Sequence, residues 1–208
     1  LRPVLVVDVE GGSFTLRNSY PEAEVVRVNK WDDLQAVYDE LKEGLHNYRT
    51  VVIDSLTELQ KFNMEQVMAR LSETNPARFE SQGDGEVASM LEWQISGSQV
   101  RKFIRAYRDL PMTAIFTALK KEDQDKRTKK VSKVPDLPGK MAHQVAGMFD
   151  MVLYMYKIDQ EEETKRLLLT QSTETIIAKD RSNKLPKPYM EAPTMAEIYR
   201  YAVKETAR

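Results

Sequence analysis

Two short, strongly apolar segments that end in acidic residues constrain this chain more than any other feature. Residues 4–9 (Val-Leu-Val-Val-Asp-Val) lead to Glu10 and two glycines, and residues 51–54 (Val-Val-Ile-Asp) lead to Ser55. Continuous β-branched runs of this kind are typical of parallel strands covered on both faces. In open α/β sheets, ligands bind beyond the carboxyl ends of such strands. Carboxylates there, from Glu10 and Asp54, suit a metal-bound nucleotide, one near Mg²⁺ and one near a water molecule.

The first two thirds of the chain alternate strand and helix patterns. Besides the runs at 3–9 and 50–54, strands are expected at 24–28 and 112–119. Apolar residues at helical spacing predict helices over 34–41, 56–71 and 91–107. Strands and helices alternating at these lengths imply right-handed βαβ crossovers and a parallel sheet.

The pattern changes after residue 148. Three short strands are expected at 149–157, 166–171 and 175–179, and the polar turn at 159–165 predicts that the first two pair antiparallel. Thr194 and Glu197 have the spacing of a capping box for a final helix. We therefore expect one α/β domain over residues 1–208, a three-layer core with a mostly parallel sheet and a C-terminal antiparallel extension.

Composition excludes several classes of function. The 208 residues contain no cysteine, which rules out disulfides, thiol catalysis and cysteine-ligated zinc, and only two histidines, His46 and His143. The net charge of −1 gives no overall attraction to nucleic acid. No apolar run approaches the roughly 18 residues of a membrane span, so a membrane partner is not expected. Because Leu1 opens directly onto a strand pattern, we expect further sequence upstream.

Glu10 is the first candidate catalytic residue. Side chains alternate along a strand, so Asp8 and Glu10 are expected on the same side, and Gly11-Gly12 allows a sharp turn after them. A carboxylate at this place can orient and deprotonate a water that attacks a γ-phosphate. The same residues are also compatible with an exposed acidic turn.

Asp54, Ser55 and Thr117 are the next candidates. Asp54 could hold Mg²⁺ through its water ligands, with Ser55 beside the nucleotide, because Mg²⁺ gives up its hydration shell reluctantly. Alternatively, Asp54 could cap the helix that follows it. Thr117, near the end of another core strand, could hydrogen-bond a γ-phosphate or merely satisfy that strand end.

Two basic segments could contact phosphate. Lys179 and Arg181 follow the last expected strand and could reach a phosphate bound to a neighbouring subunit, or form a solvated turn. Segment 120–140 holds eight cations against four anions and predicts a flexible hairpin that follows a phosphate backbone, or a solvated one. The candidate DNA-binding cations are Lys120, Lys121, Lys126, Arg127, Lys129, Lys130 and Lys133.

A second mobile loop is expected at 72–88, where Pro76, Gly83 and Gly85 interrupt a polar stretch. The basic segment 120–140 has no aromatic residue, so base stacking would have to come from elsewhere. Phe79, in the 72–88 loop, is one candidate.

The ordered set of motifs resembles the RecA-like ATPase core, and more closely the phage-encoded nucleotide-binding proteins of the single-strand-annealing recombinase type. The resemblance spans nearly the whole chain. It rests on Val-Leu-Val-Val-Asp-Val-Glu-Gly-Gly (4–12), Trp-Asp-Asp-Leu (31–34), Val-Val-Ile-Asp-Ser-Leu-Thr-Glu-Leu (51–59), Ile-Phe-Thr-Ala (115–118), Pro-Asp-Leu-Pro-Gly-Lys (135–140), Phe-Asp-Met-Val (149–152) and Ala-Lys-Asp-Arg (178–181).

This resemblance implies ATP, Mg²⁺, a homo-oligomeric ring or filament, single-stranded DNA as partner, and a role in phage recombination in the bacterial cytoplasm. Glu10 would activate water, Asp54 would be the Walker B aspartate, and Thr117 would be the polar sensor. Lys179 and Arg181 would act across a subunit interface. The segments 72–88 and 120–140 would line the axis along which DNA runs.

One departure from the family pattern limits this interpretation. The 208 residues contain no G-x-x-x-x-G-K-[S/T] phosphate-binding loop, which in such proteins precedes the strand that begins at Pro3. Charge-assisted contacts to phosphate contribute about 1.5–3 kcal/mol each. We therefore expect this chain by itself to bind ATP weakly and to hydrolyse it negligibly, and an exposed sheet edge where that strand belongs.

Two other functions remain open from sequence. The chain could be a non-catalytic, ATP-independent module that binds or anneals single strands through its basic segment. It could also be an assembly subunit in which the acidic strand ends have lost their catalytic role.

Overall fold

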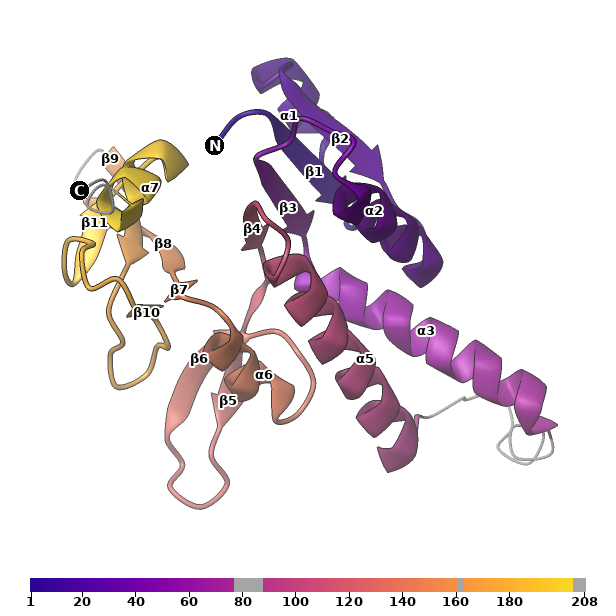
Figure 1. Ribbon diagram of the computed structural model, residues 1–208. Helices are drawn as coiled ribbons and strands as arrows, with labels where there is room; N and C mark the ends of the chain where they lie inside the picture. The colour runs from indigo at the N-terminus through magenta and orange to yellow at the C-terminus, as the bar shows by residue number, and fades with distance from the viewer. Residues whose placement is uncertain (77–87, 161–162, 204–208) are drawn as a thin grey trace. The chain divides into compact units, whose positions relative to one another are not determined.

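The computed structural model describes residues 1–76, 88–160 and 163–203 (Figure 1). The chain forms two compact units, and each is described by itself below. The first contains Leu1–Leu119 and Asp136–Met141, and the second contains Lys120–Pro135 and Ala142–Arg208. Most of the loop expected at 72–88, including Phe79, lies outside the described residues.

The first unit is built on a four-stranded parallel sheet. Its strands are β1 (Val4–Asp8), β2 (Ala23–Arg27), β3 (Thr50–Asp54) and β4 (Thr113–Phe116). Their order is β2-β1-β3-β4, and all three neighbouring pairs are parallel. The parallel sheet inferred from the alternating pattern is therefore confirmed. The two central strands, β1 and β3, are the two apolar runs that end in acidic residues, Asp8 in β1 and Asp54 in β3.

Among the described residues, the helices that connect or flank these strands are α1 (Phe14–Ser19), α2 (Trp31–Glu43), α3 (Leu56–Thr74) and α5 (Met90–Arg108). Gly44 ends α2 in the left-handed conformation, with φ of 72°. Ser89 and Glu92 form a capping box at the start of α5. The short α1 was not expected from sequence, because six residues carry too little periodicity.

Helices α2, α3 and α5 pack against one another as a single layer. The rings of Trp31 and Phe103 lie 5.3 Å apart, which joins α2 to α5. The hydroxyl of the fully buried Tyr107 donates a hydrogen bond of 2.8 Å to the backbone oxygen of Leu34 on α2. Burial raises the pKa of Tyr107 far above its ordinary value, with smaller contributions from Asp39 and Tyr38.

The strand register aligns four polar residues at the carboxyl edge of the sheet. Asp8 pairs with Arg27 on one side and with Asp54 on the other. Thr117 follows Phe116, which pairs with Ile53, and the amide of Thr117 donates to the Ile53 oxygen at 3.1 Å. This edge therefore carries a row of polar side chains from all four strands.

Asp8 shapes the turn that leads from this edge to Glu10 and α1. Its carboxylate is almost completely buried and accepts hydrogen bonds from the backbone amides of Gly11, at 2.7 Å, and Ser13, at 3.3 Å. The guanidinium of Arg27 lies 3.3 Å from the same carboxylate. Gly11 has φ of 85°, and a Cβ there would lie 2.4 Å from an Arg27 nitrogen, so the turn requires glycine.

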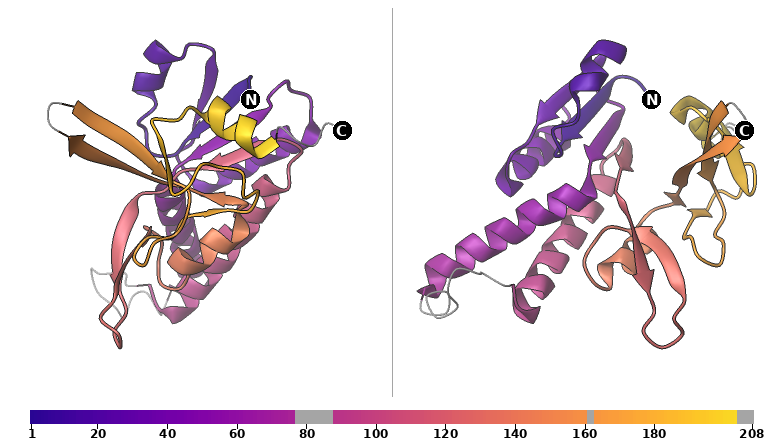
Figure 2. Two further views of the ribbon diagram at one scale, coloured as in Figure 1. Left: turned by 90° about the vertical axis from the view of Figure 1, so that its left-hand side faces the viewer. Right: turned by 180° about the vertical axis from the view of Figure 1, so that it is seen from behind.

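The second unit is mostly antiparallel. It contains the hairpin of β5 (Lys120–Gln124) and β6 (Val131–Pro135) and the antiparallel pair of β8 (Tyr154–Gln160) and β9 (Glu163–Leu169), drawn as salmon and orange arrows in Figure 2. Strand β11 (Tyr189–Glu191) pairs with β9, which gives a three-stranded sheet in the order β11-β9-β8. The other described elements are the short pair β7 (Met151–Val152) and β10 (Lys179–Asp180), α6 (Met141–Gln144, beginning in the first unit), the 3₁₀ helix η1 (Val145–Met148) and α7 (Met195–Val203). Its core includes Leu168, Leu185, Met190 and Ile198.

The C-terminal part follows the expected order with corrected limits. The antiparallel pairing of the first two strands is confirmed, but they run to Gln160 and resume at Glu163, so the expected 159–165 turn is too long. Of the strand expected at 175–179, only Lys179 lies in a strand, as the first residue of β10, which pairs with β7. Residues 175–178 make one isolated bridge, from Ile176 to Lys133, because hydrogen bonds within 172–178 hold them as a loop. The capping box of Thr194 and Glu197 is present at α7.

We predict that Asp8→Ala lowers the free energy of unfolding by about 2 kcal/mol, because the amides of Gly11 and Ser13 lose their acceptor. Denaturation in urea measures this change. The matched control is Asp109→Ala, which removes an exposed carboxylate paired with its neighbour Arg108 and should change stability by less than about 0.5 kcal/mol. Equal losses in the two variants would contradict the role given to Asp8.

The raised pKa of Tyr107 predicts a stability change at alkaline pH. Above about pH 10 the tyrosine ionises in the unfolded chain but stays protonated in the folded one, so the folded state loses relative stability as pH rises. Tyr107→Phe removes this contribution and one buried hydrogen bond. The variant should be about 1 kcal/mol less stable near pH 8, and the difference should shrink between about pH 10 and 11. Urea titrations across that range test it, and a constant difference would contradict it.

Candidate functional site

Four of the predicted site residues meet at the carboxyl edge of the sheet. The hydroxyl of Ser55 donates a hydrogen bond to the carboxylate of Glu10, and the hydroxyl of Thr117 donates one to Asp54. A backbone hydrogen bond joins the same segments: the backbone amide of Glu10 donates to the backbone oxygen of Asp54 at 3.2 Å. Residues from the ends of three adjacent strands, β1, β3 and β4, thus form one polar cluster, which we call the edge cluster (Glu10, Asp54, Ser55 and Thr117).

The four side chains differ in exposure. Glu10 and Thr117 are exposed, Asp54 is half-buried and Ser55 is buried. The alternative in which Asp54 caps the following helix does not describe the structure: Ser55 occupies the N-cap position of α3, without a capping side-chain bond, and Asp54 accepts from Thr117. Glu10 and Asp54 each keep a carboxylate at an edge open to solvent.

The donors of the edge cluster are all oxygen atoms, which suits a hard divalent cation such as Mg²⁺. Within residues 1–76, 88–160 and 163–203, no group of three or more His, Asp or Glu side chains could hold a metal ion by itself. This arrangement agrees with Mg²⁺ sites in which one carboxylate contributes and waters and nucleotide phosphates supply the remaining ligands. The residues present therefore fit a metal that arrives with a nucleotide.

Two cations beside this edge were missed by the sequence analysis. Arg27 pairs with Asp8, and the parallel register could have revealed it, since both residues end adjacent strands. Lys61, in the second turn of α3, donates a hydrogen bond of 2.5 Å to Glu58. That bond raises the pKa of Lys61, and the charges of Asp136 and Glu10 add to the effect. Lys61 is therefore a protonated amine in the electrostatic field of Glu10.

Lys179 and Arg181 lie in the second unit and contact the segment around η1. The Lys179 amine donates to the Ala146 oxygen at 2.6 Å. Arg181 pairs with Asp150 at 3.0 Å and donates to the Gly147 oxygen at 3.1 Å. Burial lowers the pKa of Lys179, and the charge of Arg181 lowers it further.

The seven candidate DNA-binding cations belong to the β5–β6 hairpin. Its tip is ordered by Asp125, whose carboxylate accepts from the backbone amides of Arg127, at 2.9 Å, and Thr128, at 2.7 Å. These bonds, that of Thr128 first, lower the pKa of Asp125. Lys126, Arg127 and Lys130 at this tip are exposed. The hairpin thus presents cations to solvent on a defined scaffold.

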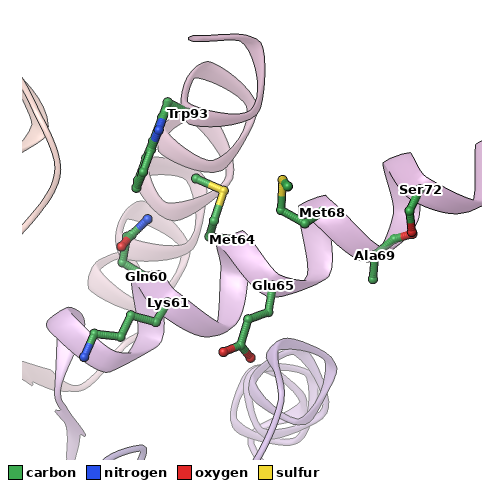
Figure 3. Close-up of a pocket in the computed structure, with 8 residues that line it drawn as sticks. All are labelled: Gln60, Lys61, Met64, Glu65, Met68, Ala69, Ser72 and Trp93. Atoms are coloured by element: carbon green, nitrogen blue, oxygen red, sulfur yellow. The ribbon is translucent and has the colours of Figure 1, made fainter. Parts of the chain in front are cut away.

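A pocket with a volume of about 660 Å³ lies between α3 and α5 in the first unit (Figure 3). Met64 and Met68 on α3 and Trp93 on α5 supply its apolar part. Lys61 and Glu65 also line it. Apolar thioether and indole groups suit packing against another surface rather than phosphate chemistry.

None of the described helices combines the length and the apolar composition needed to cross a bilayer.

Comparison with known proteins identifies a family. The family model described as an AAA domain matches residues 1–182, which include every residue of the edge cluster as well as Lys179 and Arg181. A search of curated proteins finds no match. The matched range covers most of the chain and agrees with the parallel sheet and its polar carboxyl edge. The chain belongs to the AAA domain family of nucleotide-binding ATPases.

Proposed function

We propose that this chain is the body of an ATP-dependent DNA-recombination motor of RecA type, in which ATP hydrolysis controls the binding of single-stranded DNA within a homo-oligomeric ring or filament. It would act in the cytoplasm of a bacterial host. The observation that carries the enzymatic part is the edge cluster, where Glu10, Asp54, Ser55 and Thr117 meet beyond the ends of three adjacent parallel strands.

Glu10 is the proposed general base. Its carboxylate is exposed and takes one hydrogen bond from Ser55, which orients the group while a second oxygen remains for a water molecule. A carboxylate held in this way can accept the proton of the attacking water in phosphoryl transfer.

Asp54 and Thr117 are the proposed partners of the bound nucleotide. When bound, Mg²⁺ neutralises phosphate charge and orients the phosphates for in-line attack. Asp54 would hold the water ligands of the ion, and Ser55 lies next to it in the chain. Thr117 hydrogen-bonds Asp54 and is exposed, so it can exchange this bond for one to a phosphate oxygen. Such an exchange would make strand β4 sensitive to the state of the nucleotide.

Lys179 and Arg181 are the proposed cations that complete the site of a neighbouring subunit. Arg181 is exposed and Lys179 is half-buried. Cations placed against transferring phosphates stabilise the charge of the transition state. On assembly, Arg181 would exchange its bonds to Gly147 and Asp150 for bonds to a phosphate.

A second candidate function is an ATP-independent module that binds or anneals single strands. It is favoured by one observation: the basic β5–β6 hairpin belongs to the second compact unit, whereas the edge cluster belongs to the first. DNA binding by the hairpin therefore has no built-in requirement for the edge cluster. This candidate predicts an affinity for DNA that is unchanged by ATP.

We predict that Glu10→Gln, introduced into the full-length protein, lowers the rate of ATP hydrolysis by about 10²–10⁴-fold and leaves ATP affinity nearly unchanged, because the amide cannot accept the proton of water. A phosphate-release assay and titration with a fluorescent ATP analogue measure the two quantities. Glu43→Gln, an exposed change at the end of α2, is the matched control. Unaffected turnover, or an equal loss of binding, would refute the assignment of Glu10 as base.

We also predict that neutralising the hairpin tip weakens the binding of single-stranded DNA. The variant Lys126→Gln/Arg127→Gln/Lys130→Gln should reduce the slope of log affinity against log salt by about 2, since each lost phosphate contact removes about 0.7. Lys129 is left unchanged because its φ of 59° disfavours most side chains. Fluorescence anisotropy across a salt series measures the slope.

The control for this prediction neutralises the same residue types on helices of the first unit, as Lys42→Gln/Lys102→Gln/Arg105→Gln, at exposed positions. It should retain the slope of the unaltered chain. Equal slopes for both triple variants would show that the hairpin tip does not contact the phosphates of DNA. Repeating the titration with ATP separates the motor from the ATP-independent module, because only the motor should show an affinity that depends on nucleotide.

A further inference from the structure

A groove of about 710 Å³ lies within the second unit. The hairpins β5–β6 and β8–β9 supply most of its lining, and the loop at 173–176 completes it. This loop is joined to β6 by the amide of Lys133, which donates to the Thr175 oxygen at 2.6 Å. The groove therefore has walls that are connected by hydrogen bonds within one compact unit.

Aromatic rings form one part of this groove. Tyr154 and Tyr156 are two residues apart on β8, so their side chains lie on the same side of the strand. Their ring centroids are 5.9 Å apart with the planes inclined by 27°, and both residues are half-buried. The amine of Lys133 lies 6.0 Å from the centroid of the Tyr154 ring. Two nearly parallel aromatic faces thus stand beside a cation from the basic hairpin.

Positive charge forms the rest of the polar lining. The cations among the lining residues are Lys120, Lys133, Lys157 and Arg166, and no carboxylate of the described residues lines the groove. Lys157 and Arg166 are paired across the β8–β9 ladder, and alternation along β8 places them on the side opposite to Tyr154 and Tyr156. The remaining two cations, Lys120 and Lys133, come from the β5–β6 hairpin. The amine of Lys133 lies beside the Tyr154 ring, so the hairpin supplies the positive charge on the side of the rings.

We propose that this groove binds single-stranded DNA, with Tyr154 and Tyr156 stacking on unpaired bases and with Lys120 and Lys133 holding the adjacent phosphates. This inference rests on the DNA-binding part of the proposed function and assigns the contacts to bases to a specific groove. Stacking of bases on aromatic rings tolerates any sequence.

The chemistry of the groove favours a single strand over a duplex. Paired and stacked bases do not present their faces to protein rings, whereas the bases of a single strand do. A purely electrostatic patch for duplex phosphates would need the two lysines but not the two tyrosines. The tyrosines also supply the aromatic groups that segment 120–140 does not contain.

The test measures the affinity of the full chain for a fluorescent oligothymidylate of about 30 nucleotides, for an abasic strand of equal length and for a duplex. The variant Tyr154→Leu/Tyr156→Leu keeps apolar bulk but removes the rings. It should bind oligothymidylate at least about tenfold more weakly, whereas Tyr154→Phe/Tyr156→Phe should stay within about twofold of the unaltered chain. On the abasic strand, all three proteins should bind alike.

The charge of the groove has its own measurement. The variant Lys120→Gln/Lys133→Gln should lower the salt dependence of binding by about 1.4 in log–log slope, on both the normal and the abasic strand. Tyr201→Leu, an exposed change on α7, is the control for the leucine variant and should bind normally.

The possible results separate this inference from the proposed function. If the unaltered chain binds oligothymidylate and the leucine variant binds it equally well, the groove is not the DNA site, although DNA binding stands. Equal losses on the normal and abasic strands would also overturn the stacking role, because they would report a structural defect. If the duplex binds more tightly and depends on the tyrosines, the single-strand assignment fails. If the unaltered chain binds no single strand, the groove and the DNA part of the function both fail, and the ATPase part is judged by Glu10→Gln.

Discussion

The buried carboxylate of Asp8 is the constraint on which the geometry of the edge depends. A charged group with so little exposure must have its oxygens satisfied, and here the amides of Gly11 and Ser13 and the guanidinium of Arg27 do so. These contacts require the chain to turn back sharply after β1. The turn places Glu10 where Ser55 can donate to it and where its amide reaches the Asp54 oxygen. A carboxylate that takes no part in the proposed chemistry thus positions the one that does.

The core of the fold was accessible to sequence reasoning because its signals are strong and local. The central strands β1 and β3 are continuous β-branched runs, and a parallel pair of such runs aligns their acidic ends without further information. The pairing of Glu10 with Ser55 and of Asp54 with Thr117 could be anticipated only as proximity at one edge. Which hydroxyl would contact which carboxylate depends on side-chain geometry that the pattern does not contain.

Other features depend on contacts between segments far apart in the chain. Only the last residue of the strand expected at 175–179 pairs, in β10, because Ser172 and Thr173 hydrogen-bond the backbone of Ala178 and Ile176 and compete with a sheet ladder. The limits of β8 and β9 were misjudged because polar residues near the turn still pair across the ladder. The juxtaposition of Lys133 with Tyr154 joins residues of different hairpins, and neither segment shows any local sign of it.

Arg181 has to leave its present partners before it can contact a phosphate bound to a neighbouring subunit. The pair of Arg181 with Asp150 is well exposed on both sides, and exposed ion pairs contribute only about 0–1 kcal/mol. A charge-assisted bond from a guanidinium to a phosphate contributes about 1.5–3 kcal/mol. Exchange of Asp150 for a phosphate is therefore favourable in energy even after the existing pair is broken. Lys179 differs, because burial already lowers its pKa and its amine is held by the Ala146 oxygen. Of the two cations, Arg181 can therefore exchange its present partner for a phosphate at little cost in free energy when subunits assemble. Lys179 is better placed to stabilise the segment around η1.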